Sequence, residues 1–422
     1  MTHRSTSQTT PLDRCATGPG NQQVPGGQVG RLASGRFAIG YLGASAAAQL
    51  VKTLGVRECL EGIAGRIEAD FLRWPAFQKT ARIANHCPDG VIELMPVCDA
   101  RSWSFKYVNG HPRNFRFHRP TVMAFGALAR VDTGEPEFIS ELTLTTALRT
   151  AAMSALAARH LASPQSRTMA LIGNGSQAEF QALAFHFLMG VRRLRLFDID
   201  PRATRKLADN LRSFEIEMIA CRSALEACRK ADIITTVTAD RRRAAVVTAE
   251  MVEPGMHINA VGGDSPGKTE LAPEVVREAS VFVEFEPQTR LEGEIQQMAP
   301  DFPVTELWQV LGGSAPGRRR EDEVTIFDSV GFALEDFSAL HFMREQSTVH
   351  GLLAPLDLIP ALRDPKDLFA VIGNGRAAPS APSEATHDGA VLPEAGRDEA
   401  VAHEALRGSA GRDEAARLMP VG

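Results

Sequence analysis

A glycine-rich segment near the middle of the chain has the residue types and spacing needed to hold the phosphates of a dinucleotide. In "LIGNGSQAEF" (171–180), Gly173, Gly175 and Ala178 form a GxGxxA pattern between an apolar run and an apolar helical stretch. The first glycine permits a tight turn, the second lets the backbone approach a pyrophosphate, and the small third residue keeps the helix close to the sheet. The N–H groups at the start of that helix would then face the phosphates.

The next apolar run, "LRLFD", supports the same interpretation because it ends on Asp198. An acid at this distance from the glycines typically accepts hydrogen bonds from an adenosine ribose. Since a carboxylate there also repels a 2′-phosphate, NAD is favoured over NADP. The alternative is a glycine turn in an α/β fold that binds no nucleotide. A later run, "DIITTVTAD", ends near Thr238, which we take as a candidate cofactor contact.

A lone acid follows a third buried run. "INAVGGD" leads through Gly262 and Gly263 to Asp264, so this carboxylate is presented at the end of a predicted strand. Open α/β sheets bind ligands at the carboxyl ends of their strands, and this run would lie near the nicotinamide end of the crevice. The alternative is a solvated loop acid beside Lys268.

The elements that must position these residues change character along the chain. From 166 to 283, short apolar runs alternate with helical stretches, which predicts a doubly wound parallel sheet, an NAD-binding Rossmann domain. From 38 to 150, a helical stretch (46–74) precedes alternating segments at 90–99, 102–110 and 137–144, which is typical of a mostly antiparallel sheet packed on helices. Residues 324–346 read as a strand, a glycine turn and an amphipathic helix that rejoins the earlier domain. We therefore predict an α/β protein with a Rossmann domain and an α+β domain.

Composition indicates the remaining domain boundaries and excludes several classes of protein. Segments rich in Ser, Gly, Pro and Ala predict disordered tails at 1–37 and 375–422. Between the tails we place a substrate domain (38–150), a nucleotide-binding domain (151–324) and a segment that returns to the substrate domain (325–374). With 44% hydrophobic residues and a net charge of −5, the chain lacks the basic footprint of a nucleic-acid-binding protein. Its apolar runs are too short for a membrane span.

The six cysteines form no CxxC pair and no His/Cys cluster has zinc spacing. We expect a reduced, cytoplasmic protein without a structural metal.

Several motifs together resemble one known family. "GVIELMP", "FKYVNGHP", "TALRTAA", "LIGNGSQAEFQALAFH", "INAVGGDSPGKTEL", "EPQTRLEGEIQQ" and "IFDSVGFALED" are similar to the ornithine cyclodeaminase and μ-crystallin family from about 38 to about 368. The resemblance implies a homodimer in which the substrate domains share a β-barrel. It also implies tightly held NAD and conversion of L-ornithine to L-proline and ammonia, by hydride removal from C2, ring closure and hydride return.

The resemblance also implies roles for individual residues. Asp264 would be the proton-transfer residue, and its presence distinguishes a cyclase from a simple hydride-transfer enzyme. The expected substrate-binding residues are Arg82, Glu93, Met95, Lys106, Arg149, Asp264 and Val330. The expected cofactor-binding residues are Thr121, Arg149, Gly173, Gly175, Ser176, Gln177, Asp198, Thr238, Ile258, Asn259, Ala260, Val261, Lys268 and Ser329.

Two aspects of these assignments stay open. Alternation alone does not settle whether Glu93 points inward or outward on its strand. The scaffold also suits an NAD-dependent amino-acid dehydrogenase, a cyclic ketimine reductase or a lysine cyclodeaminase, because one methylene in a substrate changes binding by only roughly 1 to 3 kcal/mol. A non-enzymatic binding protein would be expected to lack the carboxylate-binding cations, which are all present.

Overall fold

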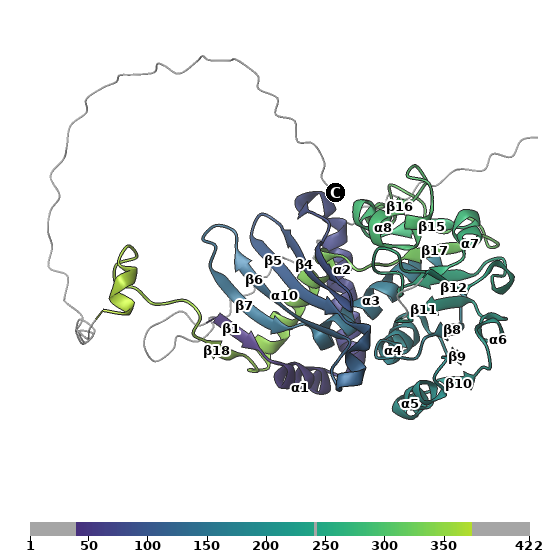
Figure 1. Ribbon diagram of the computed structural model, residues 1–422, viewed down its shortest axis with the longest axis horizontal. Helices are drawn as coiled ribbons and strands as arrows, with labels where there is room; N and C mark the ends of the chain where they lie inside the picture. Colours follow the sequence, from purple (N-terminus) through teal and green to yellow (C-terminus); the bar gives the residue numbers. More distant parts are fainter. Residues whose placement is uncertain (1–38, 240–242, 374–422) are drawn as a thin grey trace, which may run out of the picture. The chain divides into compact units, whose positions relative to one another are not determined.

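The computed structural model describes residues 39–239 and 243–373 (Figure 1). The described residues fall into two units, one that extends to residue 361 and one that begins at residue 362. Of the second unit, residues 362–373 are described, and they include one short 3-10 helix, η5 (Leu368–Val371). Both predicted disordered tails lie outside the described residues. Within the described ranges, no helix is long and apolar enough to cross a membrane.

The first sheet of the larger unit contains the residues predicted to bind substrate. Every neighbouring pair of its strands is antiparallel except β1 and β7, which are parallel. The sheet is therefore mostly antiparallel, as the sequence predicted. Side by side, the strands are β18 (Ala354–Leu356), β1 (Ile39–Leu42), β7 (Pro136–Glu141), β6 (Val122–Arg130), β5 (Ser102–Gly110), β4 (Gly90–Cys98) and β2 (Gln78–Lys79), with β3 (Ile83–Cys87) also paired to β4.

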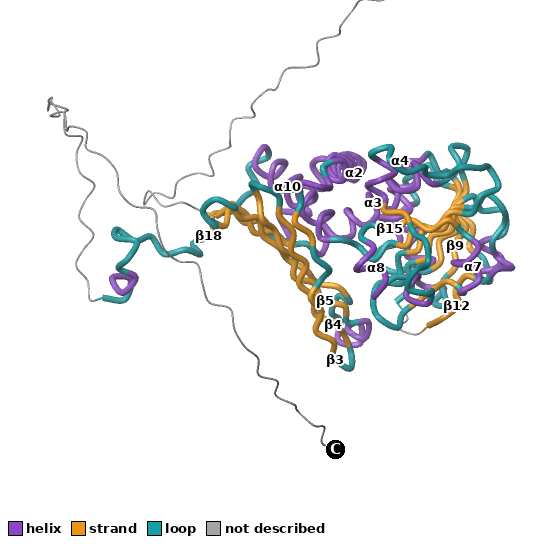
Figure 2. Tube along the Cα trace, turned by 90° about the horizontal axis from the view of Figure 1, so that it is seen from above, coloured by secondary structure: helices purple, strands orange, loops and turns teal. Residues whose placement is uncertain are grey.

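Helices cover one face of this sheet. α10 (Ala333–Val349) packs against β4, β5 and β6, and α2 (Val56–Leu72) packs against α10 (Figure 2). α1 (Ala44–Leu54) contacts α2 and α10. Side chains of β4 alternate accordingly: Val91, Glu93, Met95 and Val97 are buried on the helix side. Glu93 therefore points inward, which the sequence left open.

The second sheet is entirely parallel, which confirms the predicted α/β class. In spatial order its strands are β10 (Glu217–Ala220), β9 (Arg193–Phe197), β8 (Thr168–Ile172), β11 (Ile233–Thr236), β13 (His257–Ala260), β17 (Thr325–Asp328), β15 (Ser280–Val283) and β16 (Thr305–Glu306). A two-stranded parallel sheet, β12 (Arg243–Val247) and β14 (Thr269–Leu271), accompanies it. The helices between these strands are α4 (Ala178–Met189), α5 (Pro201–Leu211), α6 (Ala224–Cys228), α7 (Pro273–Glu278), α8 (Glu286–Glu292) and α9 (Leu307–Leu311).

The boundary of the predicted return segment differs from the structure. β17 was expected to lie in the returning part, but it pairs with β13 and β15 in the parallel sheet. Only the chain after it reaches the first sheet, where α10 packs on one face and β18 pairs with β1. A short buried apolar run can pair in either sheet, so periodicity did not distinguish them.

α3 (Thr143–Leu161) joins the two sheets, because it contacts α2 and α10 as well as α4, β13 and β17. The predicted alternating segment 137–144 ends earlier than expected. The Glu141 carboxylate accepts hydrogen bonds from the backbone N–H groups of Leu144 (3.0 Å) and Thr145 (3.3 Å), which starts the helix there. One hydrophobic core thus runs from α2 through α3 to one face of the parallel sheet.

Candidate active site

The predicted phosphate loop connects β8 to α4, the place that its sequence indicated. Gly173 has φ +93°, and a Cβ there would lie 2.8 Å from the carbonyl oxygen of Val237. Any larger residue would force the loop away from the end of β11. At Gly175 a Cβ would meet no atom within 4 Å, so the loop presents open space beside the start of α4. This close approach, with free space at the second glycine, fits a dinucleotide pyrophosphate.

Asp198 follows β9 and lies against the same loop. Its carboxylate accepts hydrogen bonds from the backbone N–H groups of Asn174 (2.6 Å) and Asp200 (2.8 Å). Ser176 is exposed, and Gln177 donates from Nε2 to the carbonyl oxygen of Ala147 at 3.0 Å. Asp198 thus both shapes the loop and stands at the edge where an adenosine ribose would lie.

The other predicted cofactor residues are less directly placed. Ile258, Asn259 and Ala260 are fully buried in β13, main-chain atoms included, so none of them is exposed at the surface of the site. Val261, just beyond the strand, is partly exposed and donates its N–H to the carbonyl oxygen of Thr236 (3.0 Å). The hydroxyl and N–H of Thr238 both bond to Glu270.

Three further predicted residues lie in loops or strands of the first sheet and the β17–α10 segment. Ser329 donates to the buried carboxylate of Glu284 at 2.7 Å, and its neighbour Val330 is 6% exposed. The carbonyl oxygen of Thr121 accepts from the N–H of His111 (2.8 Å). In the described part of the chain, no hydrogen bond joins the Thr121 side chain to the phosphate loop.

The structure requires glycine at both positions before Asp264, because a side chain there would collide with a buried carboxylate. A Cβ on Gly262 would lie 2.1 Å from Glu270 Oε2, and one on Gly263 would lie 2.4 Å from Glu294 Oε1. Both carboxylates are buried beneath the loop, and Glu294 accepts from the backbone N–H groups of Glu270 (2.7 Å) and Leu271 (3.0 Å). The loop that carries Asp264 is therefore seated directly on this pair of acids, which leaves no room for side chains at positions 262 and 263.

Arg82 is the centre of the predicted substrate site. Its guanidinium donates to Glu93 Oε2 (3.1 Å) and to the carbonyl oxygens of Val330 and Gly331 (2.6 Å each). Its Nε lies 3.0 Å from Glu292 Oε2. Burial acts to lower the pKa of Arg82, but the charges of Glu93, Glu292 and Asp264 outweigh it and raise that pKa. Asp264 is thus close enough to act electrostatically on this guanidinium.

Lys106 and Arg149 meet at one carboxylate. Lys106 Nζ lies 3.0 and 3.2 Å from the two oxygens of Asp336, and Arg149 Nε donates to Asp336 at 3.1 Å. Arg149 also binds Glu335 at 2.6 Å. Burial and the charge of Arg149 lower the pKa of Lys106 to about 8, although Asp336 acts in the opposite direction. Met95 lies directly across the strand pair from Lys106 and is buried on the same face.

Asp264 differs from these groups because its side chain is 51% exposed. Its Oδ1 lies 3.0 Å from Nζ of the buried Lys268. The structure therefore brings Arg82, Glu93, Lys106, Arg149, Asp264, Lys268 and Val330 into one region beyond the ends of the parallel strands. A half-exposed carboxylate above buried cations can exchange protons with both a ligand and solvent.

Two acids in this region, Glu292 and Asp336, were not predicted from the sequence. Glu292, at the end of α8, is 5% exposed, and its Oε2 makes no hydrogen bond among the described residues. Burial raises its pKa to about 7, and the charges of Glu93 and Asp264 add to this effect while Arg82 opposes it. Asp336 was missed as the shared partner of Lys106 and Arg149. Both occur in motifs that carried the family resemblance, "EPQTRLEGEIQQ" and "IFDSVGFALED", which was the available signal.

Comparison with known proteins assigns the chain to a family. The family model described as ornithine cyclodeaminase/mu-crystallin matches residues 45–350. The chain belongs to the ornithine cyclodeaminase/mu-crystallin family. An ornithine cyclodeaminase of Agrobacterium fabrum is 54% identical over 323 residues, which cover 76% of this chain and 91% of that protein.

Two solved structures have folds similar to that of this chain. A lysine cyclodeaminase structure, described as recognising L-lysine, L-ornithine and L-2,4-diaminobutyric acid, is 29% identical with a TM-score of 0.75, over 79% of this chain and 99% of that one. An archaeal alanine dehydrogenase dimer with bound NAD is 28% identical with a TM-score of 0.70, over 76% of this chain and 99% of that one.

Proposed function

We propose that this member of the ornithine cyclodeaminase/mu-crystallin family converts L-ornithine to L-proline and ammonia with bound NAD. The observation that carries the proposal is the placement of Asp264 beside a buried set of three cations and two further acids. A substrate with one carboxylate and two amino groups has the complementary charges. The 54% identity to a relative named ornithine cyclodeaminase supports the same choice.

The cations account for recognition of the substrate's α-carboxylate. Arg82, Lys106 and Arg149 are each buried and each already faces carboxylates of this chain. A guanidinium binds a carboxylate through two parallel hydrogen bonds, which fixes its orientation as well as its position. The α-carboxylate therefore enters a site whose cations are held in place before binding, so little ordering is left to be done.

The acids account for recognition of the amino groups. Glu93 and Glu292 flank Arg82, and Asp264 lies at the more open side. The δ-ammonium must lose a proton before its nitrogen can attack C2, and the departing nitrogen needs a proton to leave as ammonia. One acid–base group can do both in turn, and Asp264 is placed for it. Lys268 holds this carboxylate in position at 3.0 Å.

The cofactor would lie against the glycine loop, with its adenosine ribose at Asp198 and its pyrophosphate at Gly173, Gly175 and the start of α4. When bound, NAD supplies a reversible hydride acceptor for C2 of the substrate. The carboxylate of Asp198 disfavours the 2′-phosphate of NADP. Thr121, Ser176, Gln177, Thr238, Ser329 and the segment 258–261 remain proposed contacts.

We further propose that the protein is a cytoplasmic homodimer that pairs the outer faces of its first sheets. That face carries apolar side chains left 38–44% exposed at Ile92, Leu94, Trp103 and Phe125. Phe125 also contacts the rings of Phe105 and Tyr107, which extends the patch. A contiguous apolar surface of this kind marks an interaction site.

The test is a product assay with NAD far below the concentration of L-ornithine, in which proline, ammonia and NADH are followed together. The proposal predicts many prolines per NAD, equal ammonia and no accumulation of NADH. Asp264→Asn should abolish turnover, whereas Asp301→Asn, a matched change of an exposed aspartate, should not. NADH rising in step with product, or an active Asp264→Asn variant, would instead indicate a dehydrogenase or ketimine reductase. Lysine in place of ornithine tests the lysine cyclodeaminase alternative.

A further inference from the structure

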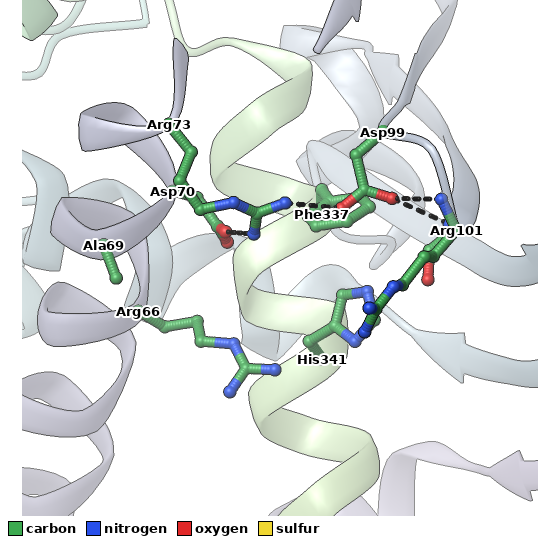
Figure 3. A pocket seen from close by; sticks show the side chains of 9 residues that line it. Arg66, Ala69, Asp70, Arg73, Asp99, Arg101, Phe337 and His341 are labelled. Atoms are coloured by element: carbon green, nitrogen blue, oxygen red, sulfur yellow. Dashed lines mark hydrogen bonds and ion pairs between the residues drawn. The ribbon is translucent and has the colours of Figure 1, made fainter. Parts of the chain in front are cut away.

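A separate cavity of about 580 Å³ lies where α2, α10 and the turn between β4 and β5 meet (Figure 3). None of the residues that line it belongs to the proposed active site. Its charged lining consists of Arg66 and Arg73 from α2 with Asp70, and Asp99 and Arg101 from the turn, and His341 of α10 completes it. Three arginines against two aspartates leave the cavity with an excess of positive charge.

The two acids are already fully engaged. Arg73 bonds to Asp70 at 3.0 Å and to Asp99 at 2.7 Å. Asp99 also accepts from the backbone N–H groups of Arg101 and Ser102 (2.8 Å each), and Asp70 accepts from Ser338 Oγ at 2.7 Å. Arg73, Asp70 and Asp99 therefore bind one another. The hydrogen-bond donors available to a ligand are those on the other side chains that line the cavity.

Three donors stay unused or weakly used. Arg66 has one ion pair, 3.3 Å from Glu345, between side chains that are 40% and 49% exposed. The Arg101 guanidinium has no ion-pair partner among the described residues. The Nε2 atom of His341 is buried and likewise has no hydrogen bond in the described part of the chain. Figure 3 shows the guanidinium groups of Arg66 and Arg101 reaching toward the ring of His341.

These donors are complementary to an oxyanion. A buried polar atom without a partner costs free energy, and in the tautomer that carries its proton on Nε2, His341 would donate to a ligand oxygen and remove that cost. Guanidinium groups bind carboxylates and phosphates through paired, charge-assisted hydrogen bonds. We propose that this cavity binds a small ligand through a carboxylate or phosphate group, held by Arg66, Arg101 and His341.

The position of the cavity connects it to the active site. The His341 ring lies 4.5 Å from that of Phe337, which also lines the cavity. On the same helix, Glu335 and Asp336 hold Arg149 and Lys106. A ligand in the cavity would therefore contact the helix that positions the proposed carboxylate-binding cations.

The test is calorimetric titration of the full chain with inorganic phosphate and, separately, with succinate. NAD and L-proline are kept saturating so that the oxyanion sites of the proposed active site are filled. We expect saturable binding of one of the two probes at one per chain. The Arg66→Gln/Arg101→Gln double variant should bind at least about tenfold more weakly, a loss of about 1.4 kcal/mol or more, because both guanidinium groups that would bind the anion are removed. Tighter binding of succinate assigns a carboxylate ligand, and tighter binding of phosphate assigns a phosphate ligand.

The matched control is Arg277→Gln, which removes an exposed arginine of α7 and should leave affinity unchanged. Arg101 is exposed and the Arg66 side chain is 40% exposed, so the double variant should fold, and its melting temperature checks this. Absence of saturable binding to the wild type at millimolar anion, or equal affinity in the double variant, would overturn the proposal. Because the comparison is between variants in this cavity, its outcome does not depend on the proposed activity.

Discussion

Replacing Glu292 by glutamine should make the protein more stable at neutral pH and not less. Burial raises the pKa of Glu292 from its usual 4.5 to about 7. The unfolded chain ionises this carboxyl from about pH 4.5 upward, while the folded chain keeps it protonated until about pH 7. Its contribution to stability is therefore present below pH 4.5 and is lost as the pH rises through the folded pKa. Glutamine has no such loss.

The size of the effect follows from the two pKa values. With about 1.4 kcal/mol per pK unit, the loss between about pH 5 and about pH 8 is about 2.5 kcal/mol. The free energy of unfolding of Glu292→Gln, relative to wild type, should rise by that amount over this range. This free energy already includes the ion pair between Glu292 and Arg82, because the charge of Arg82 lowers the same pKa.

The assay is urea unfolding of both proteins at the two pH values. Glu278→Gln, at an exposed position of α7, is the matched control and should show the same pH dependence as wild type. A difference between Glu292→Gln and wild type that does not change with pH would refute the reasoning. It would mean that Glu292 is ionised in the folded protein across the whole range.

Two further substitutions test the network that holds the proposed carboxylate site. Asp336→Asn removes the acid shared by Lys106 and Arg149, and the uncompensated buried charge should lower the free energy of unfolding by about 3 kcal/mol; an unchanged urea midpoint would contradict this. Gly331 has φ +77°, and a Cβ there would lie 2.7 Å from the Arg149 guanidinium. Gly331→Ala should therefore lower the free energy of unfolding by about 1 kcal/mol or more because of the backbone strain, and it should reduce L-ornithine turnover because it displaces Arg149. Gly313→Ala, at φ +73° with no atom within 4 Å, should lose stability alone, and equal turnover in the two variants would argue against the Arg149 contact.

The parts of the protein that sequence could predict are those whose chemistry is local. The phosphate loop and the alternation of strand and helix depend on residues within a few positions of one another, and the parallel sheet is confirmed. Asp198 lies 24 positions beyond Asn174, but the regular length of a strand–helix–strand unit predicts an acid at this distance beside the loop. The inward direction of Glu93 could not be predicted, because alternation defines two faces and only the packing of α10 selects one. The assignment of β17 failed for a related reason, since its buried run suits either sheet.

Long-range pairing explains what was missed in the site. Lys106 and Asp336 are separated by 230 positions, and no local pattern links them. Glu292 likewise acquires its raised pKa only from burial beside Arg82 and Glu93. In both cases the residue lies in a motif that the family resemblance had already singled out, but its role became visible only through its contacts.

In the proposed reaction, hydrogen leaves C2 of ornithine and returns to the same carbon after the ring has closed. The most direct test uses L-ornithine carrying deuterium at C2, with NAD far below substrate, and measures the isotope in the proline formed. We expect proline that retains deuterium at C2 through many turnovers. Proline that carries solvent hydrogen at C2, or label that leaves the substrate without reaching proline, would contradict it.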